Sequence, residues 1–339
     1  MESDTRFMRR ALQLAACGYG HTYTNPMVGA VITDPSGRVI GQGWHRRYGG
    51  PHAEVNAVRS VSAADRRLLP ESTIYVTLEP CSHYGKTPPC ARLLIEEGIG
   101  RIVVGAPDPF PEVSGRGIRM LREAGREVVT GVLEEECTAL NLPFMTAHRL
   151  RRPFVMLKWA QSADGYIGAG LPSPGEAPKE RVVFSGAVSQ VAMHRLRAGF
   201  QGIMVGVNTV IADNPRLDCR LWPGSDRPIP LTRRSERLPQ DANILSTRHL
   251  LREPAEPLAD FLDRLYREHK MTALLVEGGA EVLGEFLATG LYDALRVETS
   301  PLILSSGVKA PAYNPAALIL KENYHIGANS LSLYLNPHY

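Results

Sequence analysis

One histidine, one glutamate and two cysteines stand in two short clusters of this sequence. His52 and Glu54 lie in "PHAEV" at 51–55, and Cys81 and Cys90 enclose the stretch "CSHYGKTPPC". Imidazole and thiolate are ligands that zinc prefers, and three protein ligands leave one coordination position open, where a bound water has its pKa lowered to about 7. We therefore predict a hydrolytic zinc site with His52, Cys81 and Cys90 as ligands and Glu54 as the general acid and base.

The order of these residues is typical of zinc-dependent deaminases. H-x-E followed by P-C-x-x-C is the signature of zinc deaminases that act on nucleobases, and its glutamate moves protons without binding the metal. This chain departs from the signature at one point, because eight residues separate Cys81 from Cys90. Taken singly, the H-x-E pair carries little information and the two cysteines are better explained as buried core thiols. Their combination indicates a metal site.

Two helix N-termini are expected to position the cluster. A proline precedes His52 and favours helix initiation there. Before Cys90, Thr87 is a candidate N-cap and two prolines open the helix, which places Cys90 in the first turn. A thiol at a helix N-terminus has a lowered pKa and is predisposed to bind metal as a thiolate. We expect the two helix starts to face one ion.

The hydrophobic pattern predicts an α/β fold with two domains. A length of 339 residues suggests two domains of roughly 150 residues each. In the first half, apolar β-rich runs alternate with helical patterns, which indicates a layered α/β domain. We expect strands at 28–33, 73–78, 101–106 and 127–132, and helices at 52–61, 88–98 and 115–125.

A basic, proline-containing segment near residue 150 marks the predicted boundary between domains 1–149 and 150–339. The alternation then resumes. We expect strands at 154–162, 201–206, 272–279 and 294–301, and helices at 187–198 and 280–289.

Composition narrows the class of protein. The chain is 44% hydrophobic and 22% charged, as is usual for a globular protein. No apolar run reaches the roughly 20 residues of a membrane helix. The first 20 residues form a charged helical pattern without the apolar core of a secretory signal, so we expect a cytoplasmic protein. Five cysteines are odd in number and too few for a disulfide framework, which favours metal binding or burial.

A nucleic-acid binder or base editor is the alternative from a different class. Such a protein needs a basic groove with aromatic stacking surfaces. Here the net charge is only +3, aromatic residues make up 7% of the chain, and no basic run flanks the zinc motifs. We therefore expect a small-molecule substrate, with neither a nucleic acid nor a membrane as partner.

The first half resembles the deaminase half of the bifunctional riboflavin-biosynthesis deaminase/reductases. The motifs that carry the resemblance are "NPMVGAVI" at 25–32, "GWH" at 43–45, "GPHAE" at 50–54, "LEPCSHYGKTPPC" at 78–90 and "DPFPEVSGRGI" at 108–118. The resemblance implies a cytidine-deaminase-like three-layer α/β/α fold and a phosphorylated ribosylamino-pyrimidinone substrate. It also implies that the substrate pocket is lined by Asn25, His45, His83, Lys86 and Asp108. A lysine in a glycine-flanked loop suits a phosphate contact, although an ordinary surface lysine is the alternative.

The second half resembles the reductase half of the same family. The motifs are "FVMLKWAQSADGYIG" at 154–168, "SGAVSQVAMHRLRA" at 185–198, "VGVNTVIADNPRLDCR" at 205–220 and "LLVEGGAEVLGEFL" at 274–287. The resemblance implies a dihydrofolate-reductase-like fold that uses NADPH to reduce the ribosyl ring to a ribityl chain. Its implied cofactor contacts are Thr209, Asp213, Gly279, Ala280, Glu281, Val282, Leu283, Gly284 and Glu285. Its implied substrate contacts are Arg197, Leu217, Arg220 and Glu277.

The residues themselves are compatible with these roles. No G-x-G-x-x-G fingerprint is present, which disfavours a Rossmann domain. Gly278 and Gly279 fall where a strand gives way to a helix, and backbone amides there can hold a phosphate. The glycines could instead serve close helix packing, and Asp213 could simply begin a turn. Arginines such as Arg197 and Arg220 suit a phosphate ester, because a guanidinium offers paired charged donors.

Three departures from the reductase pattern suggest a shortened sheet. "VVFSG" at 182–186 replaces a tryptophan-containing stretch, and Arg181 stands where a serine is usual. "PLTRRSERLPQ" at 230–240 contains two prolines, which should demote the expected strand. The strand expected after it is also missing from the pattern. We therefore expect weakened NADPH binding. Arg233 and Arg234 could partly compensate by binding the cofactor's extra phosphate. The alternative is that both are ordinary exposed loop arginines.

These observations favour a bifunctional enzyme that uses Zn²⁺ and NADPH. It would first deaminate the pyrimidine and then reduce the ribosyl group. The alternative is an active deaminase whose C-terminal domain is a degenerate, noncatalytic module. We also expect a homo-oligomer.

Overall fold

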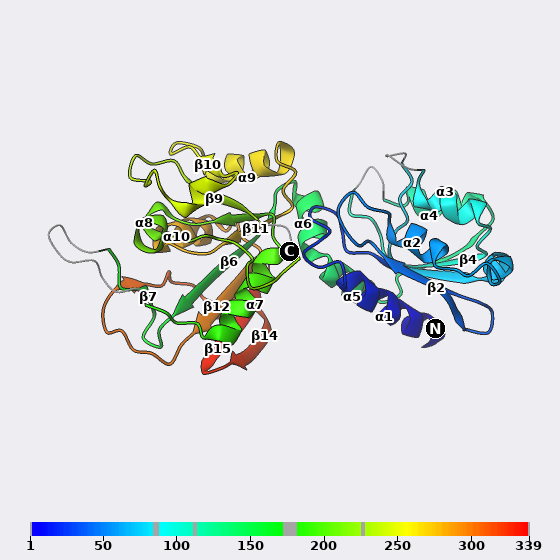
Figure 1. The fold of residues 1–339 in the computed structure, drawn as a ribbon, viewed down its shortest axis with the longest axis horizontal. Coiled ribbons are helices and arrows are strands. Elements are labelled where there is room, and N and C mark those ends of the chain that lie inside the picture. Colours follow the sequence, from blue (N-terminus) through cyan, green and yellow to red (C-terminus); the bar gives the residue numbers. More distant parts are fainter. Residues whose placement is uncertain (1, 84–87, 111–113, 172–181, 225–227, 338–339) are drawn as a thin grey trace. The chain divides into compact units, whose positions relative to one another are not determined.

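The computed structural model describes residues 2–83, 88–110, 114–171, 182–224 and 228–337 (Figure 1). The chain divides into two compact units, Met1–Leu150 and Arg151–Tyr339. No helix in the described ranges is long and apolar enough to cross a membrane.

A five-stranded sheet forms the centre of the first unit, in the order β2-β1-β3-β4-β5. Its strands are β1 Gly29–Thr33, β2 Val39–Trp44, β3 Thr73–Leu78, β4 Arg101–Ala106 and β5 Glu127–Thr130. β1 is antiparallel to both β2 and β3, whereas β3, β4 and β5 run parallel. The carboxyl ends of β3 and β4 therefore lie side by side, and the segments that follow them are brought together.

Helices cover both faces of this sheet. Successive strand residues point to opposite sides, so the apolar strands of this sheet present a hydrophobic surface on each face. Val31, Tyr75 and Val103 share one apolar core with the first group of helices, α1 Glu2–Ala16, α5 Glu134–Leu140 and α6 Leu142–Leu150. Ile74 and Ile102 share the other with α2 Ala53–Arg59, α3 Cys90–Glu96 and α4 Arg116–Glu123, and η1 Arg66–Glu71 is a 3₁₀ turn before β3. The predicted three-layer α/β/α fold is confirmed.

The second unit has an eight-stranded sheet in the order β10-β9-β8-β11-β6-β12-β15-β14. Its strands are β6 Phe154–Gln161, β8 Gly202–Met204, β9 Ile229–Arg233, β10 Leu250–Arg252, β11 Ala273–Val276, β12 Ala294–Thr299, β14 Ile319–Ile326 and β15 Asn329–Leu335. All neighbours are parallel up to β12, and β15 and β14 add an antiparallel hairpin. β7 Tyr166–Gly168 pairs with β13 Val308–Lys309 in a separate small sheet.

The helices of the second unit also lie on both faces of its sheet (Figure 1). α9 Leu258–Arg267 and α10 Ala280–Thr289 pack their buried leucines and phenylalanines against Val155, Leu157 and Trp159 of β6. α7 Ala187–Ala198 packs on the opposite face, where its Met193 contacts Arg296 of β12. The remaining elements are α8 Val207–Asp213 and the 3₁₀ turns η2 Asn243–Ser246 and η3 Pro315–Ala317.

The expectation of a shortened sheet is wrong. Residues Ile229–Arg233 form β9 between β8 and β10, and β10 is the strand that the sequence pattern did not reveal. β10 has only three residues, and the last of them is the charged Arg252. The sequence therefore contains no apolar run long enough to predict this strand. The reason for expecting a weakened cofactor cleft is therefore removed.

Pro230 is tolerated in β9 because of where its missing N–H would point. Ile229 donates its N–H to the carbonyl of Gln201 on the β8 side, at 2.8 Å. Successive residues of a strand point their N–H groups to alternate sides, so position 230 faces β10. The first residue of β10, Leu250, pairs with Leu231. Proline thus occupies the place where the β10 ladder has not yet begun, and no ladder bond is lost.

Candidate active sites

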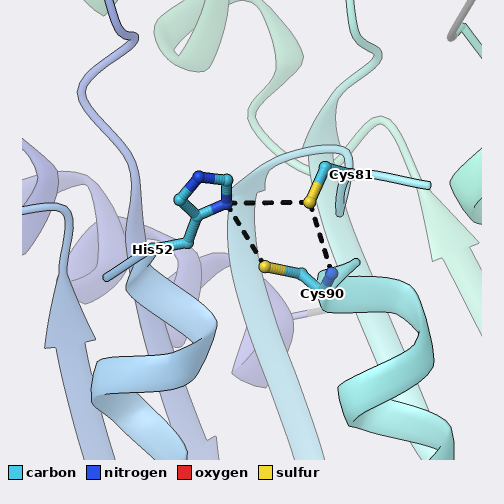
Figure 2. Close-up of side chains that lie close together, drawn as sticks. All are labelled: His52, Cys81 and Cys90. Atoms are coloured by element: carbon cyan, nitrogen blue, oxygen red, sulfur yellow. Dashed lines mark hydrogen bonds between the residues drawn. The ribbon is translucent and has the colours of Figure 1, made fainter. Parts of the chain in front are cut away.

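His52, Cys81 and Cys90 converge in the first unit (Figure 2). His52 Nδ1 lies 3.3 Å from Cys90 Sγ and 3.7 Å from Cys81 Sγ. One ligand atom from each residue falls within 4.8 Å of the others. One nitrogen and two sulfur donors at this separation fit a tetrahedral zinc ion with its fourth position open.

Three elements deliver these ligands. His52 is the N-cap residue of α2, Cys81 follows the end of β3, and Cys90 is the first residue of α3. Cys90 also donates its backbone N–H to Cys81 Sγ at 3.2 Å, which ties the two thiols together. The N-cap of α3 is Pro89, without a side-chain capping bond. Thr87, the expected N-cap, lies outside the described residues.

The thiols are electrostatically unequal. The pKa of Cys81 is lowered to about 4, first by the hydrogen bond from Cys90 and then by His52. The pKa of Cys90 is raised by that same bond and by burial. The bond to Cys81 raises the pKa of His52 to about 9. Cys81 is therefore the first of the two to become a thiolate, which is the form that binds zinc.

Glu54 lies in the first turn of α2 and is only 3% exposed. Burial, reinforced by the charge of Cys81, raises its pKa to about 7. It stands beside the cluster without belonging to the three ligands. A carboxyl group that can gain or lose a proton near neutral pH suits a general acid and base.

Asn25 and His45 adjoin the zinc ligands. His45 Nδ1 lies 3.0 Å from the carbonyl oxygen of Pro51, which can only accept, so Nδ1 carries the proton. His45 Nε2 then accepts from Asn25 Nδ2 at 3.1 Å. The rings of His45 and His52 meet edge to face at 5.7 Å. Both predicted substrate residues are thus brought to the metal cluster.

The remaining predicted substrate residues of the deaminase are His83, Lys86 and Asp108. His83 is exposed, and Lys86 lies outside the described residues. Asp108 follows β4, and burial raises its pKa, with the charges of Glu79, His83 and Cys81 acting on it. Its Oδ1 accepts the N–H of Phe110 at 2.9 Å. Asp108 therefore lies within electrostatic range of a zinc ligand.

The sequence analysis missed Glu79. This residue follows β3 and is only 4% exposed, and its carboxylate accepts backbone N–H groups from Asp108 and from residues at the start of α4. Its signal in the sequence was an acidic residue directly after an apolar strand and directly before a proline and a metal-binding cysteine.

In the second unit, Arg197 of α7 and Glu277 after β11 form a buried ion pair. Arg197 also donates to the backbone oxygen of Asp218 at 3.1 Å. Lys158 of β6, a residue that the sequence analysis missed, lies close enough for the charge of Glu277 to act on it. Burial lowers the pKa of Lys158, and Glu277 and Glu298 oppose that effect. Cations and carboxylates thus gather on the face of the sheet that α7 covers.

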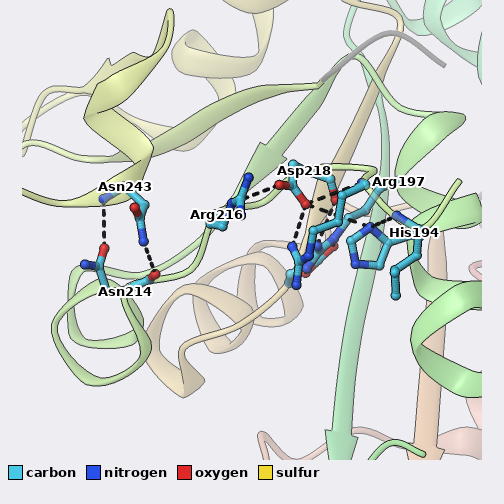
Figure 3. A network of polar contacts seen from close by, with 9 residues as sticks. His194, Arg197, Asn214, Arg216, Asp218 and Asn243 are labelled. Atoms are coloured by element: carbon cyan, nitrogen blue, oxygen red, sulfur yellow. Dashed lines mark hydrogen bonds and ion pairs between the residues drawn. The ribbon is translucent and has the colours of Figure 1, made fainter. Parts of the chain in front are cut away.

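Asp218 links these groups to Arg220 (Figure 3). Its carboxylate lies 2.6 Å from Arg220, 3.1 Å from Arg216 and 3.9 Å from His194 Nδ1. Figure 3 shows it between Arg216 on one side and the α7 residues on the other. Leu217, a predicted substrate contact, is buried with a left-handed φ of 47°. A concentration of guanidinium groups around one carboxylate is a setting in which a phosphate can bind.

Glycines bring the starts of α8 and α10 together. Gly206 is the N-cap of α8, and its N–H donates to Gly278 at 3.2 Å. Gly279, the N-cap of α10, has a φ of 81°, and a Cβ there would lie 3.3 Å from Gly206 Cα and 3.4 Å from Thr209 Oγ1. Asn208, in the first turn of α8, has a buried Oδ1 with no hydrogen-bond partner among the described residues. The first N–H groups of a helix have no partner within the helix, so the two helix starts offer donors that fit a phosphate of a bound cofactor. The orphaned Asn208 Oδ1 is an acceptor and would suit a hydroxyl group of that cofactor.

The other predicted cofactor residues of this segment lie along α10 and differ in their surroundings. Ala280, Val282, Leu283 and Gly284 belong to α10, and Leu283 is buried in the hydrophobic core. Glu281 is exposed. Glu285 forms a bidentate pair with Arg252 of β10, at 2.7 and 2.8 Å.

Asp213 is exposed at the end of α8, before a turn that Asn243 fixes by two hydrogen bonds to Asn214. Arg233 and Arg234 are exposed at the end of β9. Arg234 pairs with Glu253 at 2.7 Å. Arg181 lies outside the described residues.

Two family descriptions match this chain. Residues 1–106 match the family described as "Cytidine and deoxycytidylate deaminase zinc-binding region", which contains the zinc cluster and Glu54. Residues 153–321 match "RibD C-terminal domain", which contains the ion network and the glycine junction.

The similarity to whole proteins spans both units. The riboflavin biosynthesis protein RibD of Aquifex aeolicus is 37% identical, covering 91% of this chain and 89% of the relative. That of Escherichia coli is 32% identical, covering 90% of each. The solved structure of Acinetobacter baumannii RibD aligns with a TM-score of 0.87 at 30% identity, over 98% of this chain and 99% of the other.

A Thermotoga maritima structure, called a diaminohydroxyphosphoribosylaminopyrimidine deaminase/5-amino-6-(5-phosphoribosylamino)uracil reductase, aligns with a TM-score of 0.86 at 31% identity over 99% of each chain. The predicted resemblance is thereby confirmed over the full length. The chain belongs to the RibD family of bifunctional riboflavin-biosynthesis enzymes, with a zinc-binding deaminase region followed by a RibD C-terminal domain.

Proposed function

We propose that the first unit hydrolytically deaminates 2,5-diamino-6-(5-phosphoribosylamino)pyrimidin-4-one, and that the second reduces the ribosyl group of the product to a ribityl chain. The observation that carries the first activity is the convergence of His52, Cys81 and Cys90 beside a buried Glu54. When bound by these three residues, zinc would act as a Lewis acid and make water nucleophilic at neutral pH.

Glu54 moves the protons of this reaction. It takes one from the attacking water and delivers one to the departing amino group, so that one water is consumed and one ammonia is released. A carboxyl group whose pKa burial raises to about 7 is suited to both steps. Asn25 and His45 are hydrogen-bonded to each other next to His52. This position supports a role for both residues in orienting the pyrimidine.

The second activity is supported by two adjoining features of the second unit. The glycine junction at the starts of α8 and α10 would hold a phosphate of NADPH, which when bound supplies the hydride. The Arg197, Arg220 and Glu277 network would bind the substrate, with the arginines on its phosphate. An eight-stranded sheet with both β9 and β10 in place supports this function over the noncatalytic alternative.

One experiment tests both activities. Zinc-loaded full-length protein is incubated with the aminopyrimidine, with and without NADPH, and the products are resolved by mass. We expect the deaminated product without NADPH and the reduced product with it. Absence of deamination would overturn the first activity, and a deaminated product that persists with NADPH would overturn the second. If a dephosphorylated substrate is turned over equally well, the proposed contacts to the substrate phosphate are wrong.

We also propose a homo-oligomer and a reducing, cytoplasmic setting. β14 is an edge strand that exposes Ile319, Leu320 and Tyr324, and an exposed apolar edge favours contact with another chain. Zinc-binding thiolates persist where thiols stay reduced. Light scattering of the purified protein should give a multiple of 37.2 kDa, and Leu320→Glu should lower that mass. A monomeric wild type would contradict the oligomer.

A further inference from the structure

We infer that Glu79 is a positioning residue for deamination, which holds Asp108 and the start of α4 in place beside the zinc cluster. The inference rests on the deaminase activity proposed above. Glu79 is not one of the three grouped zinc ligands, and its effect on the reaction passes through the backbone that it fixes.

Four backbone N–H groups point at this one carboxylate. Oε2 accepts from Asp108 at 3.3 Å and from Gly115 at 3.0 Å. Oε1 accepts from Gly117 at 3.0 Å and from Ile118 at 3.3 Å. Both oxygens are therefore committed to backbone donors that come from two separate turns of the chain.

The start of α4 explains why a carboxylate is needed there. The first N–H groups of a helix have no partner within the helix, and negative charge is favourable beside them. Gly115, the N-cap of α4, has no side chain and adopts a φ of 75°. Glu79, which follows β3, thus supplies the cap that α4 lacks. Glutamine would turn an NH₂ group toward these donors and lose both the charge and part of the acceptors.

The same carboxylate connects the cap to the site. Asp108 shares Oε2 with Gly115, and the charges of Glu79, His83 and Cys81 all act on the Asp108 carboxyl. A Cβ on Gly117 would lie 2.0 Å from the carbonyl oxygen of Pro80, so the start of α4 rests directly on the backbone that leads into Cys81. If Glu79 releases either turn, Asp108 moves relative to the zinc ligands.

The test compares Glu79→Gln with Asp4→Asn in the full-length, zinc-loaded protein. Asp4 is a matched control, because it is another buried carboxylate of the same unit, is paired with Arg101 and belongs to α1 on the other face of the sheet. For Glu79→Gln we expect a KM for deamination raised about tenfold, with zinc content and reduction unchanged. Asp4→Asn should leave KM unchanged. Hydrogen exchange should accelerate at the amides of Asp108, Gly115, Gly117 and Ile118 in Glu79→Gln alone.

A double-mutant cycle decides whether Glu79 acts through Asp108. Asp108→Ala keeps the backbone N–H but removes the carboxyl group. We expect Glu79→Gln to raise KM little further in that background, because residues that act as a unit are not additive. Additive effects, an unchanged KM or unchanged exchange at the four amides would each overturn the inference.

Two further arms keep the result interpretable. If Glu79→Gln does not fold, Glu79→Asp, which keeps the charge on a shorter side chain, should give an intermediate KM, and a wild-type KM in this variant would overturn the inference. A wild type that does not deaminate contradicts the proposed function, whereas the exchange measurement still reports on Glu79 by itself.

Discussion

Arg197 of α7 and Glu277 form a bidentate ion pair, with Nε to Oε1 at 2.7 Å and Nη2 to Oε2 at 2.6 Å. Their side chains are only 14% and 8% exposed. Parallel guanidinium–carboxylate bonds fix both groups in one plane. The pair therefore holds the arginine in a defined orientation toward the Asp218 segment, to which it also donates.

Glu277→Gln should impair reduction and stability together. The substitution leaves a buried guanidinium without its counter-ion, which typically costs about 3–5 kcal/mol. We expect kcat/KM for reduction to fall at least hundredfold and the thermal midpoint to drop, with deamination unchanged. Glu253→Gln is the control, since it breaks an exposed pair with Arg234 and should change neither value. Normal reduction in Glu277→Gln would remove this residue from the site.

Glu54→Gln should separate chemistry from metal binding. The amide keeps the shape of the side chain but can neither accept nor release the proton, so deamination should fall by about 10²–10⁴-fold or more. Zinc content, measured by atomic absorption, should stay at one per chain because Glu54 is not among the ligands. A parallel loss of zinc would instead make Glu54 a ligand.

Cys81→Ser and Cys90→Ser should each lose zinc and deamination, because a hydroxyl is a poor zinc ligand near neutral pH. A chelator applied to the wild type should do the same, and reduction should survive in every case. Cys17→Ser is the control, since Cys17 is exposed and outside the cluster. Stoichiometric zinc with full activity in either variant would exclude that cysteine.

Gly279→Ala should weaken NADPH binding. The added Cβ would strain a residue at φ 81° and crowd Gly206 and Thr209 at the junction of α8 and α10. Gly290→Ala provides the matched control, because Gly290 caps the other end of α10 with φ 69° and has open space around it. Titration of the full-length protein with NADPH by calorimetry should show a weaker Kd for Gly279→Ala alone. Equal affinities in the two variants would move the cofactor away from this junction.

The Asp4–Arg101 pair should make the first unit acid-sensitive. The hydrogen bond from Arg101 lowers the pKa of Asp4 below 3.8, so its contribution to stability is fully present above that value and is lost as pH falls through the folded pKa. We expect the free energy of unfolding to fall more steeply below about pH 4 in the wild type than in Asp4→Asn. Identical slopes would show that the pair contributes no linked stability.

Much of the zinc site could be predicted because its residues are local. His52 and Glu54 are two apart at one helix start, and Cys90 opens another. Short spacing and helix-capping chemistry leave few arrangements for such residues. The alternation of strands and helices similarly predicted the layered fold, since periods of 2 and 3.6 reflect which side chains are buried.

Tertiary structure alone decided the features that depend on partners distant in sequence. β9 exists because β8 and β10 flank it and because Pro230 falls where the β10 ladder has not begun, which no local propensity records. Glu79 gains its role from N–H groups some 29 to 39 residues away. Lys158 meets Glu277 only through the pairing of β6 with β11. Sequence determined which side chains could do chemistry, and long-range strand pairing and packing decided which of them meet.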